Sequence, residues 1–166
     1  MTGERLWLFD TTLRDGGQTR GVDFTAEDKR FIARALDDFG LDFIEGGWPG
    51  ANPTDDAFFA SDNQLKRAKL VAFGMTRRGG RSAENDPGLS AVLGANAQST
   101  CLVGKTWDFH VTTALGIELD ENLLMIRESV ELAKTRGFLS MFDCEHYFDG
   151  YRANPDYALS CVKAAF

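Results

Sequence analysis

Short apolar runs alternate along the chain with longer segments that have a helical pattern. Five runs have the length and composition of buried strands, namely residues 6–9, 41–45, 70–73, 99–103 and 139–142. In the segments between them, apolar side chains recur every three or four residues, which is typical of amphipathic helices. The pattern therefore predicts five strand-then-helix units in a row, which favours a parallel sheet with crossover helices.

Local signals predict where several of these helices begin and end. Thr25 and Asp28 form a capping-box pattern at the start of the first helix, and Gly40 is a natural stop. Asp120 is expected to cap a long helix. The first helix is expected to face the core with Phe31, Ile32, Ala35, Leu36 and Phe39. The remaining helices are predicted to start at residues 52–56, to cover residues 89–95 and to span about residues 154–166.

Two folds accommodate five such units. A complete TIM barrel needs eight units and about 250 residues, so this 166-residue chain would form a partial (β/α)8 barrel with parallel strands. A five-stranded doubly wound sheet of the flavodoxin type would instead be complete. No linker or repeat divides the chain, so we expect residues 1–166 to belong to a single domain.

Composition excludes several classes of protein. The chain has 18 Lys and Arg against 25 Asp and Glu, a formal net charge of −7, and 43% hydrophobic residues, as in an ordinary globular protein. The acidic excess argues against a nucleic-acid partner. No apolar run is long enough to span a membrane, and the first residues do not resemble a signal peptide. Three cysteines without a CxxC pair fit a cytoplasmic location rather than a disulfide framework or a structural zinc site.

Polar side chains that can perform chemistry come directly after the predicted strands. Arg14 and Asp15 follow the first strand, Glu45 ends the second, and Glu145 follows the fifth. Active sites of α/β folds lie at the carboxyl ends of parallel strands, so this placement favours an enzyme. The Asp15 carboxylate is suited to a hard divalent cation, and the Arg14 guanidinium to negative charge on a substrate oxygen. Taken alone, the two residues also fit an ion pair in a surface loop.

Longer motifs carry a resemblance to a known family. Residues 9–18, FDTTLRDGGQ, resemble the signature of the isopropylmalate, homocitrate and citramalate synthase family of metal-dependent TIM-barrel lyases and acyltransferases. Residues 43–53, 104–111 and 142–151 resemble the versions of later motifs that are found in citramalate synthases. The resemblance extends from about Leu8 to the last residue.

The resemblance implies a reaction and its cofactors. Members of this family condense acetyl-CoA with a 2-oxo acid and then hydrolyse the thioester. For the citramalate type, the 2-oxo acid is pyruvate and the product serves isoleucine biosynthesis. A divalent cation (Mg, Mn or Zn) would lie at the top of the barrel, and the full-length enzyme would be a homodimer.

The resemblance also implies roles for individual residues. Asp15 matches a metal ligand, Arg14 matches the group that stabilises the forming alkoxide, and Glu145 matches a catalytic acidic residue. The positions that match substrate-binding residues are Arg14, Gln18, Glu45 and His110. By itself, His110 is also compatible with a hydrogen-bonded structural histidine. We expect Asp15, Glu45, His110 and Glu145 to converge at one end of the strands.

One departure from the family limits what this chain is expected to do alone. The family has a His-x-His metal motif on a later strand, whereas the only histidines here are His110 and His146. The chain is therefore interpreted as the N-terminal part of a catalytic barrel that is inactive in isolation. Two alternatives stay open: isopropylmalate or homocitrate synthesis in place of citramalate synthesis, and a noncatalytic fragment or binding module.

Overall fold

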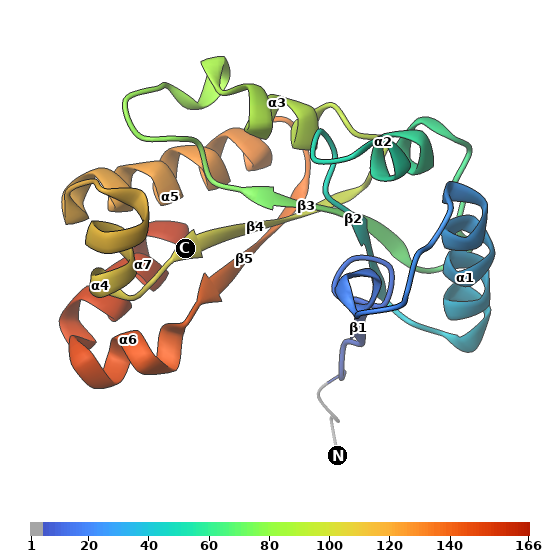
Figure 1. Ribbon diagram of the computed structural model, residues 1–166, viewed down its shortest axis with the longest axis horizontal. Helices are drawn as coiled ribbons and strands as arrows, with labels where there is room; N and C mark the ends of the chain where they lie inside the picture. The colour runs from blue at the N-terminus through green and yellow to red at the C-terminus, as the bar shows by residue number, and fades with distance from the viewer. Residues whose placement is uncertain (1–4) are drawn as a thin grey trace. The chain divides into compact units, whose positions relative to one another are not determined.

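The computed structural model describes residues 5–166 and shows an α/β protein (Figure 1). Its strands are β1 (Phe9–Asp10), β2 (Phe43–Gly47), β3 (Lys69–Met75), β4 (Ser99–Lys105) and β5 (Leu139–Glu145). Its α-helices are α1 (Ala26–Phe39), α2 (Pro53–Ala60), α3 (Pro87–Leu93), α4 (Asp108–His110), α5 (Leu119–Thr135), α6 (Tyr147–Ala153) and α7 (Pro155–Ala165). Shorter helical turns are η1 (Gly16–Gln18), η2 (Ala83–Asn85) and the π-helical η3 (Val111–Leu115).

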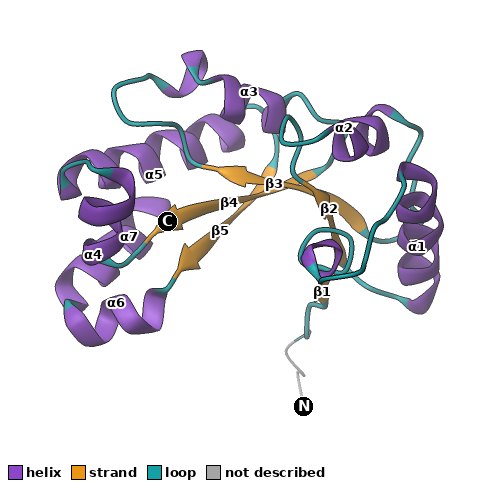
Figure 2. Ribbon diagram, viewed as in Figure 1, coloured by secondary structure: helices purple, strands orange, loops and turns teal. Residues whose placement is uncertain are grey.

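The strand order distinguishes between the two predicted folds. The five strands form one sheet in the order β1-β2-β3-β4-β5, drawn in orange in Figure 2. β1 pairs in parallel with β2, and β2 pairs in parallel with β3. A sheet that adds each new strand beside the previous one has the topology of a TIM barrel, whereas a doubly wound sheet reverses its direction at a switch point. The partial-barrel prediction is therefore confirmed, and the doubly wound alternative is wrong.

The described residues group into two compact units. The first contains residues 5–73 and 95–99, and the second contains residues 74–94 and 100–166. In the first unit, α1 and α2 pack against β2 and against each other. In the second unit, α5 and α7 pack against β5 and against each other. Each unit has its own buried apolar residues, which include Ile44, Phe58 and Leu70 in the first and Val111 and Ile126 in the second.

The predicted ends of α1 are confirmed. The Thr25 hydroxyl accepts a hydrogen bond from the Asp28 amide at 3.1 Å, and the Asp28 carboxylate accepts one from the Thr25 amide at 2.9 Å. The helix ends at Gly40, whose φ of 105° is the left-handed conformation that favours glycine. The reciprocal cap at one end and the glycine at the other account for the observed length of the helix.

The predicted core face of α1 is wrong in part. Phe31 is 75% exposed and Phe39 is 83% exposed, whereas Lys29, Ala33 and Asp37 are buried. The two buried charged side chains have hydrogen-bonding partners inside the first unit, which makes their burial possible. The inward face of this helix is therefore partly polar. The positions of its large apolar side chains do not identify that face.

Two other predicted boundaries are also wrong. The first strand was expected at residues 6–9, but β1 starts at Phe9, and Leu6 is largely exposed. Because β1 lies at the edge of the sheet, it has a strand on only one side, and its pairing starts at Leu8, whose carbonyl accepts the Phe43 amide at 3.0 Å. Helix α5 begins after Glu118, so Asp120 lies in its first turn rather than at its cap.

A buried carboxylate stabilises the segment that precedes β3. Asp37 accepts hydrogen bonds from the backbone amides of Lys66, Arg67 and Ala68 at 2.6, 2.9 and 2.7 Å. Burial acts to raise the pKa of Asp37, but the amide donors more than offset this effect, so its pKa lies below the ordinary 3.8. The carboxylate form therefore contributes stability that is present above the unfolded-state pKa and is lost as the pH falls through the folded-state pKa.

We expect Asp37→Asn to lower the free energy of unfolding at pH 7 by about 1–3 kcal/mol, because an amide oxygen is a weaker acceptor for these buried donors. The difference between the variant and the parent chain should shrink as the pH is lowered below about 4. Urea unfolding followed by circular dichroism at pH 7 and pH 3 measures both effects. Asp38→Asn is the matched control, since Asp38 is exposed and pairs with the exposed Lys66 ammonium. An equal loss in both variants would contradict the assignment.

Candidate functional site

The loop after β1 places Arg14 against β2. The backbone amides of Arg14, Asp15 and Gly16 all donate to the Thr11 carbonyl, at 3.1, 2.8 and 3.2 Å, and so close a tight turn. From this turn, Arg14 Nε donates to Glu45 Oε2 at 2.7 Å, and Arg14 Nη1 donates to Asp15 Oδ1 at 2.8 Å. The turn therefore gathers three of the predicted site residues into one ion-pair network.

The members of this network differ in their access to solvent. The Glu45 side chain is 1% exposed, and that of Asp15 is 56% exposed. The guanidinium lies over the ring of Phe73 in β3, with Arg14 Cζ 4.0 Å from the ring centroid, which is a cation–π contact. Trp48 meets the edge of the same Phe73 ring, with centroids 5.6 Å apart at 83°. The contacts to Nε, to Nη1 and to the face of the guanidinium hold it in one orientation, and Nη2 forms no hydrogen bond with the residues that the structure describes.

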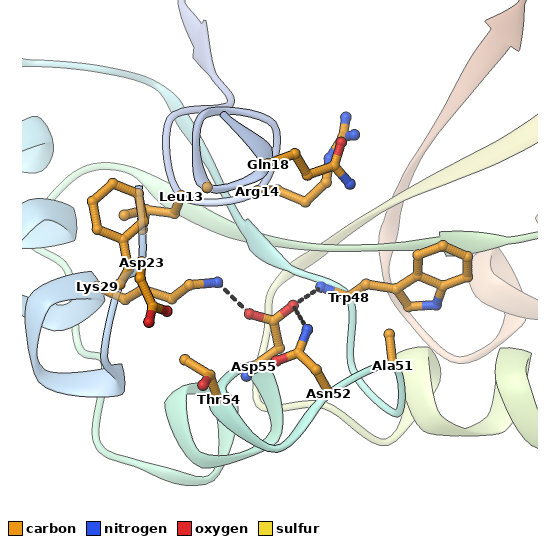
Figure 3. A pocket seen from close by; sticks show the side chains of 12 residues that line it. Leu13, Arg14, Gln18, Asp23, Lys29, Trp48, Ala51, Asn52, Thr54 and Asp55 are labelled. Atoms are coloured by element: carbon orange, nitrogen blue, oxygen red, sulfur yellow. Dashed lines mark hydrogen bonds and ion pairs between the residues drawn. The ribbon is translucent and has the colours of Figure 1, made fainter. Parts of the chain in front are cut away.

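A cavity of about 350 Å³ opens beside Arg14 (Figure 3). It is lined by Leu13, Arg14, Gly17, Gln18, Asp23, Phe24, Lys29, Trp48, Ala51, Asn52, Thr54 and Asp55. Its volume is that of a small-molecule site, and polar or charged side chains outnumber apolar ones in its wall. The predicted substrate-binding residue Gln18 thus lies on the same cavity as Arg14.

A buried ion pair forms part of the wall of this cavity. Lys29 Nζ pairs with Asp55 and donates to the Gly46 carbonyl at 3.0 Å. Asp55 Oδ2 also accepts the Trp48 amide at 2.8 Å and Asn52 Nδ2 at 2.9 Å, and Figure 3 shows Asp55 between these groups. Sequence reasoning missed this pair, because the residues 52–56 indicated only the start of a helix.

Gly47 allows the loop after β2 to approach this ion pair. Its φ is 146°, and a Cβ atom at this position would come within 2.5 Å of the Asp55 carboxylate. A residue with a side chain would therefore have to displace either the loop or the carboxylate. The glycine is required by a close approach as well as by its backbone conformation.

The second unit has a separate cluster at the carboxyl ends of β4 and β5. Lys105, the last residue of β4, forms an ion pair with Glu145, the last residue of β5. Thr106 joins the same strand ends, because its amide and hydroxyl both donate to the Glu145 carbonyl, at 3.2 and 2.7 Å. The predicted acidic residue Glu145 thus has a cationic partner that sequence reasoning missed. The only available signal was a lysine at the end of an apolar strand.

His110 belongs to the same cluster. Its ring centroid lies 4.6 Å from that of Trp107 and 4.6 Å from that of His146, and the two imidazoles meet edge to face at 85°. His110 Nδ1 is buried, and no group in the described part of the chain forms a hydrogen bond with it. His146 has a left-handed backbone with φ 56° and ψ 33°, which is uncommon for a residue other than glycine. Nδ1 of His146 lies 3.7 Å from Asp149 Oδ2.

The structure therefore brings the predicted residues together in two groups. Arg14, Asp15, Gln18 and Glu45 lie around one cavity in the first unit, or directly beside it. His110 and Glu145 lie after β4 and at the end of β5 in the second unit. That all of these residues serve one site stays a prediction.

The predicted metal ion requires several ligands that lie close together. Within residues 5–166, no three His, Cys, Asp or Glu side chains gather into a group that could hold a metal ion. Asp15 presents an exposed carboxylate that is suited to one coordination position. These residues do not form a metal centre by themselves, so the role of Asp15 as a ligand stays a prediction.

No helix among the described residues is long and apolar enough to cross a membrane.

Comparisons with known proteins agree with the motifs and with the strand order. The chain is 55% identical over 161 residues to (R)-citramalate synthase of Streptomyces coelicolor, covering 95% of this chain and 30% of that protein. It is 31% identical over 167 residues to 2-isopropylmalate synthase of Saccharolobus solfataricus, covering 99% of this chain and 40% of that protein. HMG-CoA lyase from Brucella melitensis has the same fold, with a TM-score of 0.70 at 14% identity over 98% of this chain and 59% of that one.

The chain spans about 30% of the length of the citramalate synthase that it matches. The resemblance that its motifs carry is confirmed along almost the whole chain. The family model described as HMGL-like matches residues 5–166. On this evidence, the chain belongs to the HMGL-like family.

Proposed function

We propose that this chain is part of a citramalate synthase, which condenses acetyl-CoA with pyruvate and hydrolyses the thioester to give citramalate and free CoA. The observation that carries the proposal is the fixed orientation of Arg14 beside a cavity of about 350 Å³. The higher identity to the citramalate synthase than to the isopropylmalate synthase supports pyruvate as the 2-oxo acid.

The proposed reaction uses Arg14 at the point where negative charge develops. A base removes a proton from the acetyl methyl group, and the resulting enolate carbon attacks the ketone carbon of pyruvate. The ketone oxygen becomes an alkoxide, which the Nη2 donors of Arg14 stabilise more strongly than the neutral ketone. The alkoxide is then protonated, and water cleaves the thioester. Glu145 is the proposed acid or base. His110, whose Nδ1 is buried, is proposed to donate a hydrogen bond to a substrate oxygen.

The proposal also includes a metal ion, a cellular location and an oligomeric state. A divalent cation (Mg, Mn or Zn) would take Asp15 as one ligand and would draw its other ligands from outside residues 5–166. When bound, such a cation polarises a substrate carbonyl. We also propose that the full-length protein is a cytoplasmic homodimer that acts in isoleucine biosynthesis.

The test is an assay of free CoA release by the full-length protein. With acetyl-CoA, pyruvate and Mg²⁺ or Mn²⁺, we expect turnover in the ordinary range of enzymes, about 1–10³ per second. The 166-residue chain alone should show none, because it lacks the other ligands and strands that the proposal requires. Faster turnover with 2-oxoisovalerate or 2-oxoglutarate than with pyruvate would refute the assigned substrate. No turnover with any 2-oxo acid would refute the proposed reaction.

A chimaeric protein makes this test independent of the surrounding reading frame. In the chimaera, residues 5–166 replace the matching segment of the Streptomyces coelicolor synthase. We expect the chimaera to release CoA in the presence of pyruvate, and the same chimaera carrying Asp15→Asn to lose this activity. A folded but inactive chimaera would show that this segment does not carry a functional half of the site.

A further inference from the structure

We propose that the buried Lys29–Asp55 ion pair positions Arg14, by fixing the loop after β2 and, through that loop, the contacts that orient the guanidinium. The inference deepens the proposed function and rests on it, since it assigns Lys29 and Asp55 as positioning residues for the 2-oxo acid site. Neither residue has a role in the family resemblance or in the proposed reaction steps.

The ion pair holds the backbone at the end of β2 and the start of the loop that follows. Lys29 Nζ holds the carbonyl of Gly46, and Asp55 Oδ2 holds the amide of Trp48. These two groups lie on either side of Gly47, where the Asp55 carboxylate leaves no room for a side chain. The ion pair therefore fixes both peptide groups that flank Gly47, the last residue of β2.

The residues at both ends of this segment are connected to the Arg14 guanidinium. Glu45 directly precedes the fixed segment and accepts the hydrogen bond from Arg14 Nε at 2.7 Å. Trp48 ends the segment and packs against Phe73, and Phe73 lies beneath the guanidinium at 4.0 Å. A shift of this loop would therefore disturb both the edge contact and the face contact of Arg14. Such a displacement costs catalytic rate because reaction requires the donors to lie close to the reacting oxygen.

The charges of Lys29 and Asp55 need a reason other than stability. Both side chains are almost fully buried, and taking two charges out of water offsets much of their mutual attraction. An apolar pair of similar volume is often as stable as a buried ion pair. What an apolar pair cannot supply is the donor to Gly46 and the acceptor for Trp48. The backbone hydrogen bonds are thus the specific contribution of this pair.

The experiment separates positioning from stability with a paired substitution in the full-length protein. Lys29→Met combined with Asp55→Leu replaces the ion pair with apolar side chains. We expect the free energy of unfolding to fall by about 1–3 kcal/mol, because the Gly46 carbonyl and the Trp48 amide lose their partners. We expect kcat/KM for pyruvate to fall about 10–100-fold and KM for acetyl-CoA to change less than twofold. Asp55→Asn alone, which keeps an acceptor for the Trp48 amide, should retain more of the activity than the paired variant.

Asp37→Asn is the matched control for these variants. Asp37 is a buried aspartate on the same helix as Lys29, but it holds the backbone before β3 rather than the loop after β2. It should lose stability and keep kcat/KM for pyruvate. A folded paired variant with normal kcat/KM would overturn the inference, as would an equal loss of kcat/KM in the Asp37 control.

A spectroscopic readout keeps the inference testable without activity. The chain has three tryptophans, so Trp7→Phe and Trp107→Phe leave Trp48 as the single indole of residues 1–166. In this background of the 166-residue chain, we expect the Lys29 and Asp55 substitutions to increase quenching of Trp48 by acrylamide. Unchanged quenching would refute the fixing of the loop. An inactive parent protein with increased quenching in the variant would refute only the proposed function.

Discussion

Replacing Arg14 with methionine is expected to lower kcat/KM for pyruvate at least about 100-fold in the full-length protein, because it removes the donors proposed to face the alkoxide. The same substitution should destabilise the fold by about 3 kcal/mol, since the Glu45 carboxylate is 1% exposed and would lose the guanidinium that faces it. Steady-state kinetics and urea unfolding measure the two effects separately.

Two further variants separate these roles of Arg14. Arg14→Lys keeps the positive charge but loses the planar fork that contacts Glu45 and Asp15 together, so it should recover stability better than activity. Arg14→Met combined with Glu45→Gln removes the buried carboxylate as well, and should recover stability without recovering activity. Near-normal kcat/KM in Arg14→Met would refute the assignment of this residue to the developing charge.

The isolated 166-residue chain is expected to self-associate despite its net charge of −7. β1 and β5 lie at the two edges of the sheet, and edge strands present backbone groups that pair readily with another chain. Apolar side chains are exposed beside β1, where Leu6 is 79% exposed, and on the outer face of α1 at Phe31 and Phe39. Exposed apolar side chains of this size promote association.

Sedimentation velocity over a concentration series tests this expectation. We expect the mean sedimentation coefficient to rise with concentration, and to rise less in a variant with Leu6→Glu and Phe31→Glu. Both positions are largely exposed, so the substitutions should leave the free energy of unfolding within about 0.5 kcal/mol. Val130→Glu would be an unsuitable control, because Val130 is buried. A monomer at all concentrations would refute the prediction.

The order of elements could be predicted from the sequence because each central strand contains a short run of apolar residues. β2, β3 and β4 are buried along nearly their whole length, so burial leaves a direct mark on their composition. The extent of β1 could not be predicted in this way. Its length depends on how many of its residues find a partner on β2, and apolar composition does not carry that information.

The face of α1 was mispredicted for a related reason. Hydrophobic spacing identifies the inward face of a helix when the neighbouring surface is apolar. Lys29 and Asp37 face inward because they form hydrogen bonds with polar groups of other elements. Those partners, Asp55 and the amides of residues 66–68, are distant in the sequence. A pattern read along one helix contains no information about them.

The candidate site was predictable where chemistry follows a strand directly. Arg14 and Glu45 were identified from their positions after β1 and within β2, and the structure shows that they form an ion pair. Phe73, Lys105 and the Lys29–Asp55 pair were missed, since their importance depends on contacts between elements that are far apart in sequence. The sequence predicts which groups perform the chemistry, and the structure shows which groups contact them.

The left-handed backbone of His146 has a consequence for the engineering of this protein. A residue with a Cβ atom in this conformation costs about 1–2 kcal/mol relative to glycine, which adopts it freely. Screening for heat resistance would therefore enrich glycine at position 146, and each such variant would lose the imidazole that packs against His110. Selection for thermal tolerance therefore acts against the contact between His110 and His146, so a stabilised version that keeps this contact is best sought with position 146 held constant.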